Sequence, residues 1–163
     1  MRWIVYIAAL ALTLLAPVKR TDVGMLQPVE VICLQRRGEE LLITTDTQDR
    51  GAGKTLAKAV ENLKETTAGI VYMDTAEYLL IYPGCDLEAQ RLKEYLKSNV
   101  RICRISQEMD LAEAALFLDV HKPTGHLGDW EIGEKPDELR IENGRFQLVE
   151  NNKKKEEKGV DKS

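Results

Sequence analysis

The sequence is poor in the residues from which most catalytic and metal-binding sites are built. It has only two histidines and three cysteines, and no two cysteines lie in a Cys-x-x-Cys spacing. Structural zinc sites draw their ligands from such clusters, so a zinc site is not expected. The motifs His-Glu-x-x-His and Gly-x-Ser-x-Gly, which mark zinc proteases and serine hydrolases, are also absent. We predict no catalytic residue, no metal ligand and no cofactor.

Basic and aromatic residues are not concentrated anywhere in the chain. There are 23 lysines and arginines against 27 aspartates and glutamates, a formal net charge of -4, and 6% of the residues are aromatic. A nucleic-acid surface needs a basic patch, often with aromatic side chains for stacking, so no nucleic-acid partner is expected. The length of 163 residues suits one domain with its own hydrophobic core.

The cysteines do not form an evident disulfide framework. Cys33 and Cys103 lie in apolar, strand-like runs and are interpreted as small apolar side chains, and Cys85 is the third. An exported protein more often carries paired cysteines. The odd number of cysteines favours a reducing or anaerobic setting, or else one disulfide with one free thiol. The sequence does not distinguish these two alternatives.

A long uncharged segment lies at the N-terminus. Residues 3–18, WIVYIAALALTLLAPV, are 16 residues without a charge, between Arg2 and the pair Lys19-Arg20. As a helix this segment would span roughly 24 Å, against roughly 30 Å of bilayer hydrocarbon, which is typical of the apolar part of a signal peptide. No small-x-small cleavage site follows it. We therefore predict a signal peptide or, with more weight, an uncleaved signal-anchor helix in residues 1–20.

This segment also sets the expected location. The protein is expected at the cell membrane, held by residues 3–18, with its domain outside the cytoplasm. A secreted protein is the first alternative. A soluble protein in which the apolar helix is buried in the core is the second.

Apolar periodicity predicts strands and helices in the middle of the chain. Two β-branched runs around the turn at residues 36–39 predict an antiparallel hairpin. A helix is expected after Thr55, and its inward residues at helical spacing are Leu56, Ala59, Val60 and Leu63. Strands are expected at 78–82 and 100–105, with helices after the N-caps Asp86 and Asp110. The prediction is an α+β fold, a small mixed or antiparallel sheet of about four to five strands with two to three helices.

The domain division follows the composition. Residues 22–122 are expected to form the α+β domain. Residues 123–150 are richer in glycine and proline, and Asn143-Gly144 between two alternating runs predicts a hairpin at 139–149. This hairpin either adds strands to the sheet or stands alone. Residues 151–163 have no apolar periodicity and are expected to be disordered.

The segment Gly51–Thr55, GAGKT, looks like the end of a phosphate-binding loop. Such a loop needs Gly-x-x-x-x-Gly-Lys-Ser/Thr, and the first glycine would fall at Gln48. Two nearby aspartates would also repel a phosphate. We therefore interpret Gly51 and Gly53 as a tight turn and Thr55 as the N-cap of the helix.

The two histidines do not form a recognisable catalytic or metal-binding motif. His121 and His126 lie five residues apart in a segment interrupted by proline and glycine. They would need further ligands, such as Asp119 or Asp129, to hold a metal ion. We interpret both as ordinary loop residues and predict no metal site.

Five stretches from Asp22 to about Lys122 follow a characteristic order. They are DVGMLQPVEVICLQRRGEELLITTD, GKTLAKAVENL, EYLLIYPG, LKEYLKSNVRICRI and DLAEAALFL. In this order they resemble the N-terminal domain of the Ger(x)C, or GerAC-like, spore germination lipoproteins. The resemblance implies that Gly53-Lys54-Thr55 is a turn without nucleotide. It also implies a shortened relative without lipid, because Pro17–Arg20 stand where the family has its lipid-bearing Cys.

The functional prediction combines these observations. We predict a non-enzymatic exported or membrane-tethered protein-interaction module, linked to spore germination or sporulation. Its partners would be other membrane or envelope proteins, and no small-molecule substrate is expected. One alternative is a ring-forming structural subunit of a sporulation envelope complex. Another is a phosphate- or nucleotide-binding enzyme that uses the Gly51–Thr55 loop.

Overall fold

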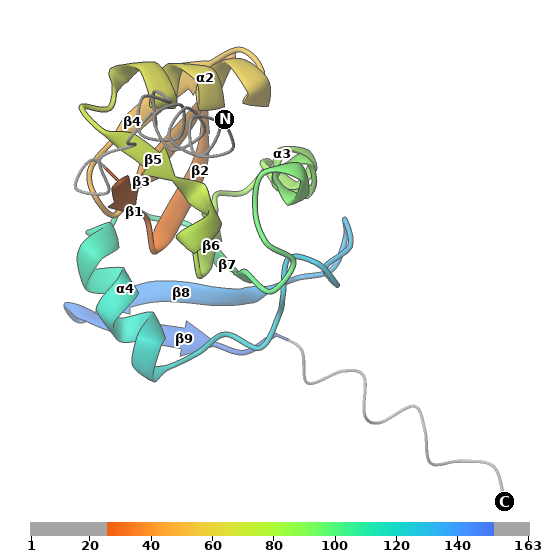
Figure 1. Cartoon of the computed structure of the whole chain (residues 1–163). Coiled ribbons are helices and arrows are strands. Elements are labelled where there is room, and N and C mark those ends of the chain that lie inside the picture. Colours follow the sequence, from red (N-terminus) through yellow and green to blue (C-terminus); the bar gives the residue numbers. More distant parts are fainter. Residues whose placement is uncertain (1–25, 152–163) are drawn as a thin grey trace, which may run out of the picture.

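The computed structural model describes residues 26–151, which form a seven-stranded main sheet with helices on both faces and a separate two-stranded sheet (Figure 1). The strands are β1 (Leu26–Pro28), β2 (Val31–Arg37), β3 (Glu40–Thr45), β4 (Arg50–Gly53), β5 (Ile70–Tyr72), β6 (Tyr78–Ile81), β7 (Arg101–Ile105), β8 (Asp137–Glu142) and β9 (Arg145–Val149). The α-helices are α2 (Leu56–Thr66), α3 (Asp86–Arg91) and α4 (Leu111–Val120), and two 3-10 helices span Met73–Thr75 and Leu92–Glu94.

The main sheet is mixed and has seven strands in the order β4-β3-β2-β6-β7-β8-β9. The four central strands β2, β6, β7 and β8 are parallel to their neighbours within that group. Antiparallel hairpins extend the sheet on both sides, through β3 and β4 at one end and β9 at the other. A separate parallel pair joins β1 to β5.

Alternation along the strands creates two cores, one on each face of the sheet. On the α2 face, Ile32, Leu79 and Ile102 pack against the apolar stripes of α2 and α3. On the α4 face, the intervening residues, such as Leu80 and Cys103, pack against α4. Because successive side chains of a strand point to opposite faces, the central strands are apolar throughout.

The close packing of α2 on β4 depends on two glycines. A Cβ atom at Gly51 would lie 2.3 Å from the carbonyl oxygen of Ala59, and one at Gly53 would lie 2.6 Å from the Ala59 nitrogen. Glycine is therefore needed because the helix backbone lies directly on the strand. The prediction that Gly51 and Gly53 form a tight turn is wrong, since both belong to β4.

The structure tests the predicted fold class and the predicted N-cap residues of three helices. The α+β class is confirmed, although the described sheet has seven strands rather than about four to five. Thr55 caps α2 as predicted, with its side chain accepting from the Lys58 backbone, and Asp110 caps α4 through the Ala112 and Glu113 amides. The N-cap prediction for Asp86 is wrong. Cys85 occupies that position, and Asp86 pairs with Arg104 at 2.5 Å.

The Asn143-Gly144 hairpin joins the main sheet. Asn143 and Gly144 have φ angles of 52° and 73°, as a two-residue turn between twisted strands requires. The first strand of this hairpin, β8, pairs in parallel with β7. Of the two alternatives open from the sequence, the hairpin therefore adds strands to the sheet edge.

The structure also bears on the predictions for the cysteines and for a membrane helix. Cys33 and Cys103 are buried and free, as expected of small apolar side chains, and Cys85 is buried and free as well. Within residues 26–151, no helix combines the length and apolar character needed to cross a membrane. The apolar segment 3–18 and the tail from residue 152 lie outside the described residues.

Candidate functional site

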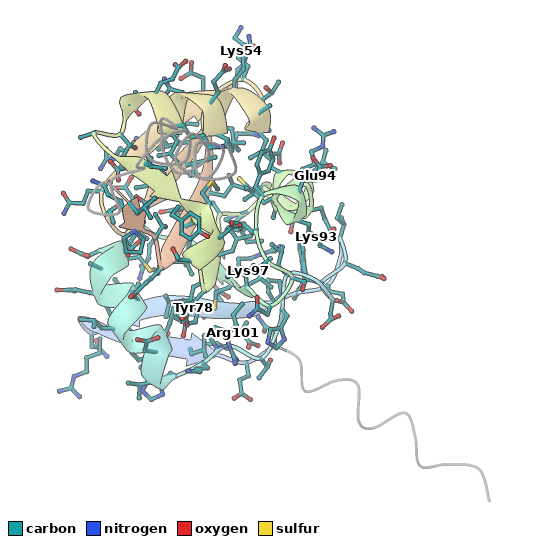
Figure 2. All side chains as sticks on the ribbon, viewed as in Figure 1. Lys54, Tyr78, Lys93, Glu94, Lys97 and Arg101 are labelled. Atoms are coloured by element: carbon teal, nitrogen blue, oxygen red, sulfur yellow. The ribbon has the colours of Figure 1, made fainter. Side chains whose placement is uncertain are left out.

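The residues of the GAGKT segment already have structural partners. The Ala52 amide, which a phosphate-binding loop would turn toward its ligand, donates to Asn62 Oδ1 at 2.9 Å. The Lys54 side chain is 73% exposed, lies 3.7 Å from Glu39 Oε2, and points away from the body of the molecule (Figure 2). A phosphate cradle needs free amides that converge on one point. This segment instead forms a strand covered by a helix.

Of the histidines and their proposed co-ligands, only His126 and Asp129 line a common hollow. The ring of His121 stacks on Phe117 with centroids 4.5 Å apart, and Asp119 accepts from the Tyr78 hydroxyl. His126 forms an isolated bridge with Arg101 at the start of β7. In the part of the chain that the structure describes, no group of three His, Cys, Asp or Glu side chains is placed to hold a metal ion.

The main candidate site is an open groove on the α4 face. Its volume is about 330 Å³. It lies where α4 stops covering the sheet, since α4 packs over β2, β6, β7, β8 and β9, and no helix within residues 26–151 covers β3 and β4 on this face. The lining residues are Cys33, Gln35, Arg37, Leu42, Thr44, Arg50, Tyr82, Ile105, Glu108, Met109 and Leu111. We call this feature the β3–α4 groove.

The position of the groove follows from the topology. Arg37 ends β2, Tyr82 follows β6, and Glu108 follows β7, so one wall lies at the carboxyl ends of three parallel strands. In open sheets with parallel strands, ligands commonly bind in the crevice outside these carboxyl ends. The opposite wall is formed by the antiparallel pair β3–β4, where Thr44 lies directly opposite Arg50.

The floor of the groove is apolar, and its thiol and phenol groups are unreactive near neutral pH. Burial raises the pKa of the Cys33 thiol to about 12, with a smaller contribution from Cys85. Burial also raises the pKa of Tyr82 to about 12. A thiol must ionise to act as a nucleophile, and a phenol must ionise to act as a base. Near neutral pH both groups remain protonated, so the floor provides contact area for a ligand.

The rim of the groove is charged. The Arg37 guanidinium donates to Glu108 Oε1 at 2.5 Å and to Gln35 Oε1 at 3.1 Å, joining the end of β2 to the loop before α4. Both members of the ion pair are well exposed, at 58% and 77% of the side chain. The Arg50 side chain has no hydrogen bond or ion pair with any residue from 26 to 151. The groove therefore presents an unpaired cation beside an apolar floor.

A second hollow of about 450 Å³ lies at the opposite end of the parallel strands. Figure 2 shows two of its cations, Lys97 and Arg101, near the start of β7. Its lining includes Asp74 and Glu77 as well, and the Arg101 guanidinium donates to the Pro123 carbonyl at 2.6 Å. Ala76 is the one apolar side chain in this lining, so the hollow offers little apolar contact area, and we regard the β3–α4 groove as the better candidate.

Little in the sequence pointed to this groove. Its residues come from β2, β3, β4, the end of β7, the start of α4 and the segments after β6 and β7, so they meet only through long-range strand pairing. Leu42 and Thr44 alternate with the buried Leu41 and Ile43, which marks β3 as half-buried. That alternation shows a face without helix cover, but it does not show which neighbours complete a site.

The fold and the groove together define a class of protein, an open α+β sheet in which the described helices leave a half-face beside α4 uncovered. Comparisons with protein-family models, with curated proteins and with solved structures found no match to this chain.

Proposed function

We propose that this chain is a non-enzymatic protein-interaction module that is tethered to a membrane by residues 3–18. The β3–α4 groove is its contact surface, and the occupant is an extended segment of another membrane or envelope protein. The observation that carries this proposal is the half-face of the sheet that α4 leaves open, with an apolar floor and a charged rim.

The chemistry of the groove specifies the kind of segment. Leu42, Ile105 and Met109 offer an apolar floor for one or two aliphatic side chains of the partner. Arg50 offers a guanidinium to a carboxylate, and such charge-assisted hydrogen bonds fix the register of a bound segment. We therefore expect a segment in which apolar residues are followed or preceded by Asp or Glu.

The shape of the groove favours a protein partner over a small molecule. Sites for small molecules usually enclose most of the ligand surface. The β3–α4 groove is bounded on one side by β3 and β4, which no helix of the described part of the chain covers on this face, and it is open on that side. An extended segment can lie along such a surface and bury apolar area over several residues.

The biological setting rests on the motif resemblance between Asp22 and about Lys122. That resemblance, to the N-terminal domain of the Ger(x)C lipoproteins, is the basis on which we propose a role in spore germination or sporulation. A ring-forming structural subunit remains the alternative within this setting. It requires a heterologous interface between copies, whereas the groove proposal requires a different protein.

The proposal is tested by site-specific cross-linking in the cells that make the protein. A photo-reactive amino acid at Thr44, in the groove, is expected to join the full chain to one discrete partner protein. The same amino acid at Glu61, on the exposed side of α2, is the control and is expected to give no such product. Arg50→Glu, combined with the probe at Thr44, is expected to abolish the product by charge repulsion.

Two outcomes would overturn the proposal. One is equal cross-linking from Thr44 and Glu61. The other is a product from Thr44 that Arg50→Glu leaves unchanged, which would remove the assigned role of the cation.

The rival enzyme hypothesis is separated by titration with a fluorescent nucleotide. The full chain is expected to show no saturable binding, because the Ala52 amide and the Gly51–Gly53 backbone are already engaged by α2. Saturable binding that Lys54→Ala abolishes would favour the nucleotide-binding enzyme.

A further inference from the structure

The two edge strands of the main sheet are treated differently by the rest of the molecule. Figure 1 shows β4 beneath α2 at one end of the sheet and β9 as the outermost strand at the other end. On β4, Asn62 accepts from the Ala52 amide and Thr66 donates to the Arg50 carbonyl, each at 2.9 Å. These α2 side chains take the place of a neighbouring strand, so the β4 edge is blocked.

Among residues 26–151, nothing pairs with the outer edge of β9. The two-residue turn at Asn143-Gly144 makes Glu142 and Arg145 a hydrogen-bonded pair, and the pattern then alternates along the ladder. The amides and carbonyls of Phe146 and Leu148 therefore point away from β8. Throughout residues 26–151, no residue forms a hydrogen bond with these outward groups.

Within the described residues, β9 has little of the usual protection of an edge strand. Natural edge strands are protected by short length, charged side chains, proline, bulges or a covering element. The sequence of β9 is RFQLV, with Arg145 at one end as its single charge and without proline, and its pairing with β8 is regular over all five residues. An unprotected edge of this kind is a template for pairing with another strand.

The pattern of β9 is complementary to itself. An antiparallel partner centred on Gln147 places Gln147 opposite its own copy, Phe146 opposite Leu148, and Arg145 opposite Val149. In this register the outward amides and carbonyls of Phe146 and Leu148 from both copies make four backbone hydrogen bonds. No like charges face each other across the pair.

We propose that the protein forms a two-fold symmetric dimer through antiparallel pairing of β9 with β9 of a second copy, centred on Gln147. The main sheet then continues from one copy into the other, and both copies use the same surface. Such an isologous contact closes on itself, so it gives a dimer rather than a filament.

Side-chain packing supports this register. Phe146 and Leu148 lie on the α4 face, where they are half-buried, and the Phe146 ring lies 5.6 Å from that of Phe117. Pairing places Leu148 of the second copy against Phe146, and aromatic–aliphatic pairs across strands are favourable contacts. The dimer therefore covers apolar surface that one copy leaves partly exposed. This inference is independent of the β3–α4 groove, which lies toward the other end of the sheet.

The register makes a specific prediction for disulfide cross-linking of the full chain in mild detergent. Gln147 and its copy form a non-hydrogen-bonded pair, in which the Cα atoms are about 4.5 Å apart, a separation that a disulfide spans. Gln147→Cys is therefore expected to give a covalent dimer on mild oxidation. Arg145→Cys is the matched control, because its copy lies about 14 Å away along the strand and no bridge is expected. The native cysteines are buried and contribute little background.

Charge substitutions at the same position give a second test that leaves the fold intact, since Gln147 is exposed. Gln147→Lys alone and Gln147→Glu alone are each expected to halve the protein mass measured by light scattering, because like charges meet at the two-fold axis. Mixing the two variants is expected to restore a dimer of one copy of each. Ala52→Lys, on the blocked edge strand, is expected to leave the mass unchanged.

Three results would overturn the dimer. The first is that the full chain is a monomer at every concentration tested. The second is that Gln147→Cys cross-links no better than Arg145→Cys. The third is that Gln147→Lys keeps the mass of the native protein. A cross-link from Gln147→Cys to a different protein would assign the β9 edge to that protein and also reject the second copy.

Discussion

Gly51 and Gly53 show how one residue type serves two very different roles in proteins. In a phosphate-binding loop, glycine lets the backbone approach an anion. In this chain the same residue lets the backbone of α2 approach β4, since a Cβ at either position would collide with Ala59 or its neighbours. Both roles need the absence of a side chain, so the sequence alone does not separate them.

At the residue scale, Leu63 tests how the helix is placed. Leu63 is fully buried between α2 and the sheet. We expect Leu63→Ala to lower the free energy of unfolding by about 2–5 kcal/mol, through lost burial and the cavity that remains. Urea denaturation measures the change. Lys54→Ala is the control and should stay within about 0.5 kcal/mol, as for other exposed positions. A loss below about 1 kcal/mol for Leu63→Ala would show that Leu63 does not lie on the buried face of α2.

The buried thiols predict a dependence of stability on pH. Burial raises the pKa of Cys85 from 9.0 to about 11 and that of Cys33 from 9.0 to about 12. Below pH 9 the thiols are protonated in both the folded and unfolded states, so they contribute no pH dependence. From pH 9 toward pH 11 the unfolded thiols ionise while the buried ones do not, and stability falls by up to about 1.4 kcal/mol per pH unit for each thiol.

Urea denaturation at pH 8 and pH 10 checks this expectation. Cys85→Ala removes one of the buried thiols and should make the decline between the two pH values shallower. An equal decline in the native protein and in Cys85→Ala would mean that Cys85 is not shielded from solvent as described.

At the scale of single elements, the sequence predicts those with strong periodicity and misses those without it. The stripe Leu56, Ala59, Val60 and Leu63 identified α2, and Asp110 marked the start of α4. In contrast, β4 reads RGAG and has no β-branched residue, because α2 requires glycines there. Its strand character comes from pairing with β3 and from cover by α2, and neither is a local property of four residues.

The cover of β4 by α2 gives a prediction for Asn62. Asn62→Ala removes the acceptor of the Ala52 amide and leaves that donor unpaired at the sheet edge. Because this hydrogen bond is exposed, we expect a loss of about 0.5–1.5 kcal/mol in the free energy of unfolding. Glu61→Ala, its exposed neighbour, should change stability by less than about 0.5 kcal/mol. Equal effects from the two substitutions, measured by urea denaturation, would mean that the amide is satisfied by water instead.

At the scale of the whole molecule, the groove could not be predicted, because it results from what α4 leaves uncovered. The sequence identified α4 and the hairpin at 139–149, but it left open whether this hairpin joined the sheet. The pairing of β8 with β7 decides that question and places α4 over β2, β6, β7 and β8 rather than β3. Long-range pairing of this kind depends on contacts between distant residues, which local patterns do not contain.

The N-terminal segment makes a prediction for the whole chain. An apolar segment such as residues 3–18 would expose a contiguous apolar surface in water, and a bilayer removes that exposure. We expect the full-length protein to fractionate with membranes and to stay there after a high-salt wash, since salt screens charges but not apolar insertion. Release by salt would indicate electrostatic attachment, and recovery in the cytosolic fraction would contradict the tether.

The central claim is that a partner protein occupies the β3–α4 groove, and the most direct measurement is the accessibility of the groove in its native membrane. The full chain carrying Thr44→Cys is labelled with a maleimide in open membrane fragments and, in parallel, after purification in detergent. We expect slower labelling in the membranes than in the purified protein, whereas Glu61→Cys should label at the same rate in both. Equal rates for Thr44→Cys in the two preparations would show an unoccupied groove and contradict the account.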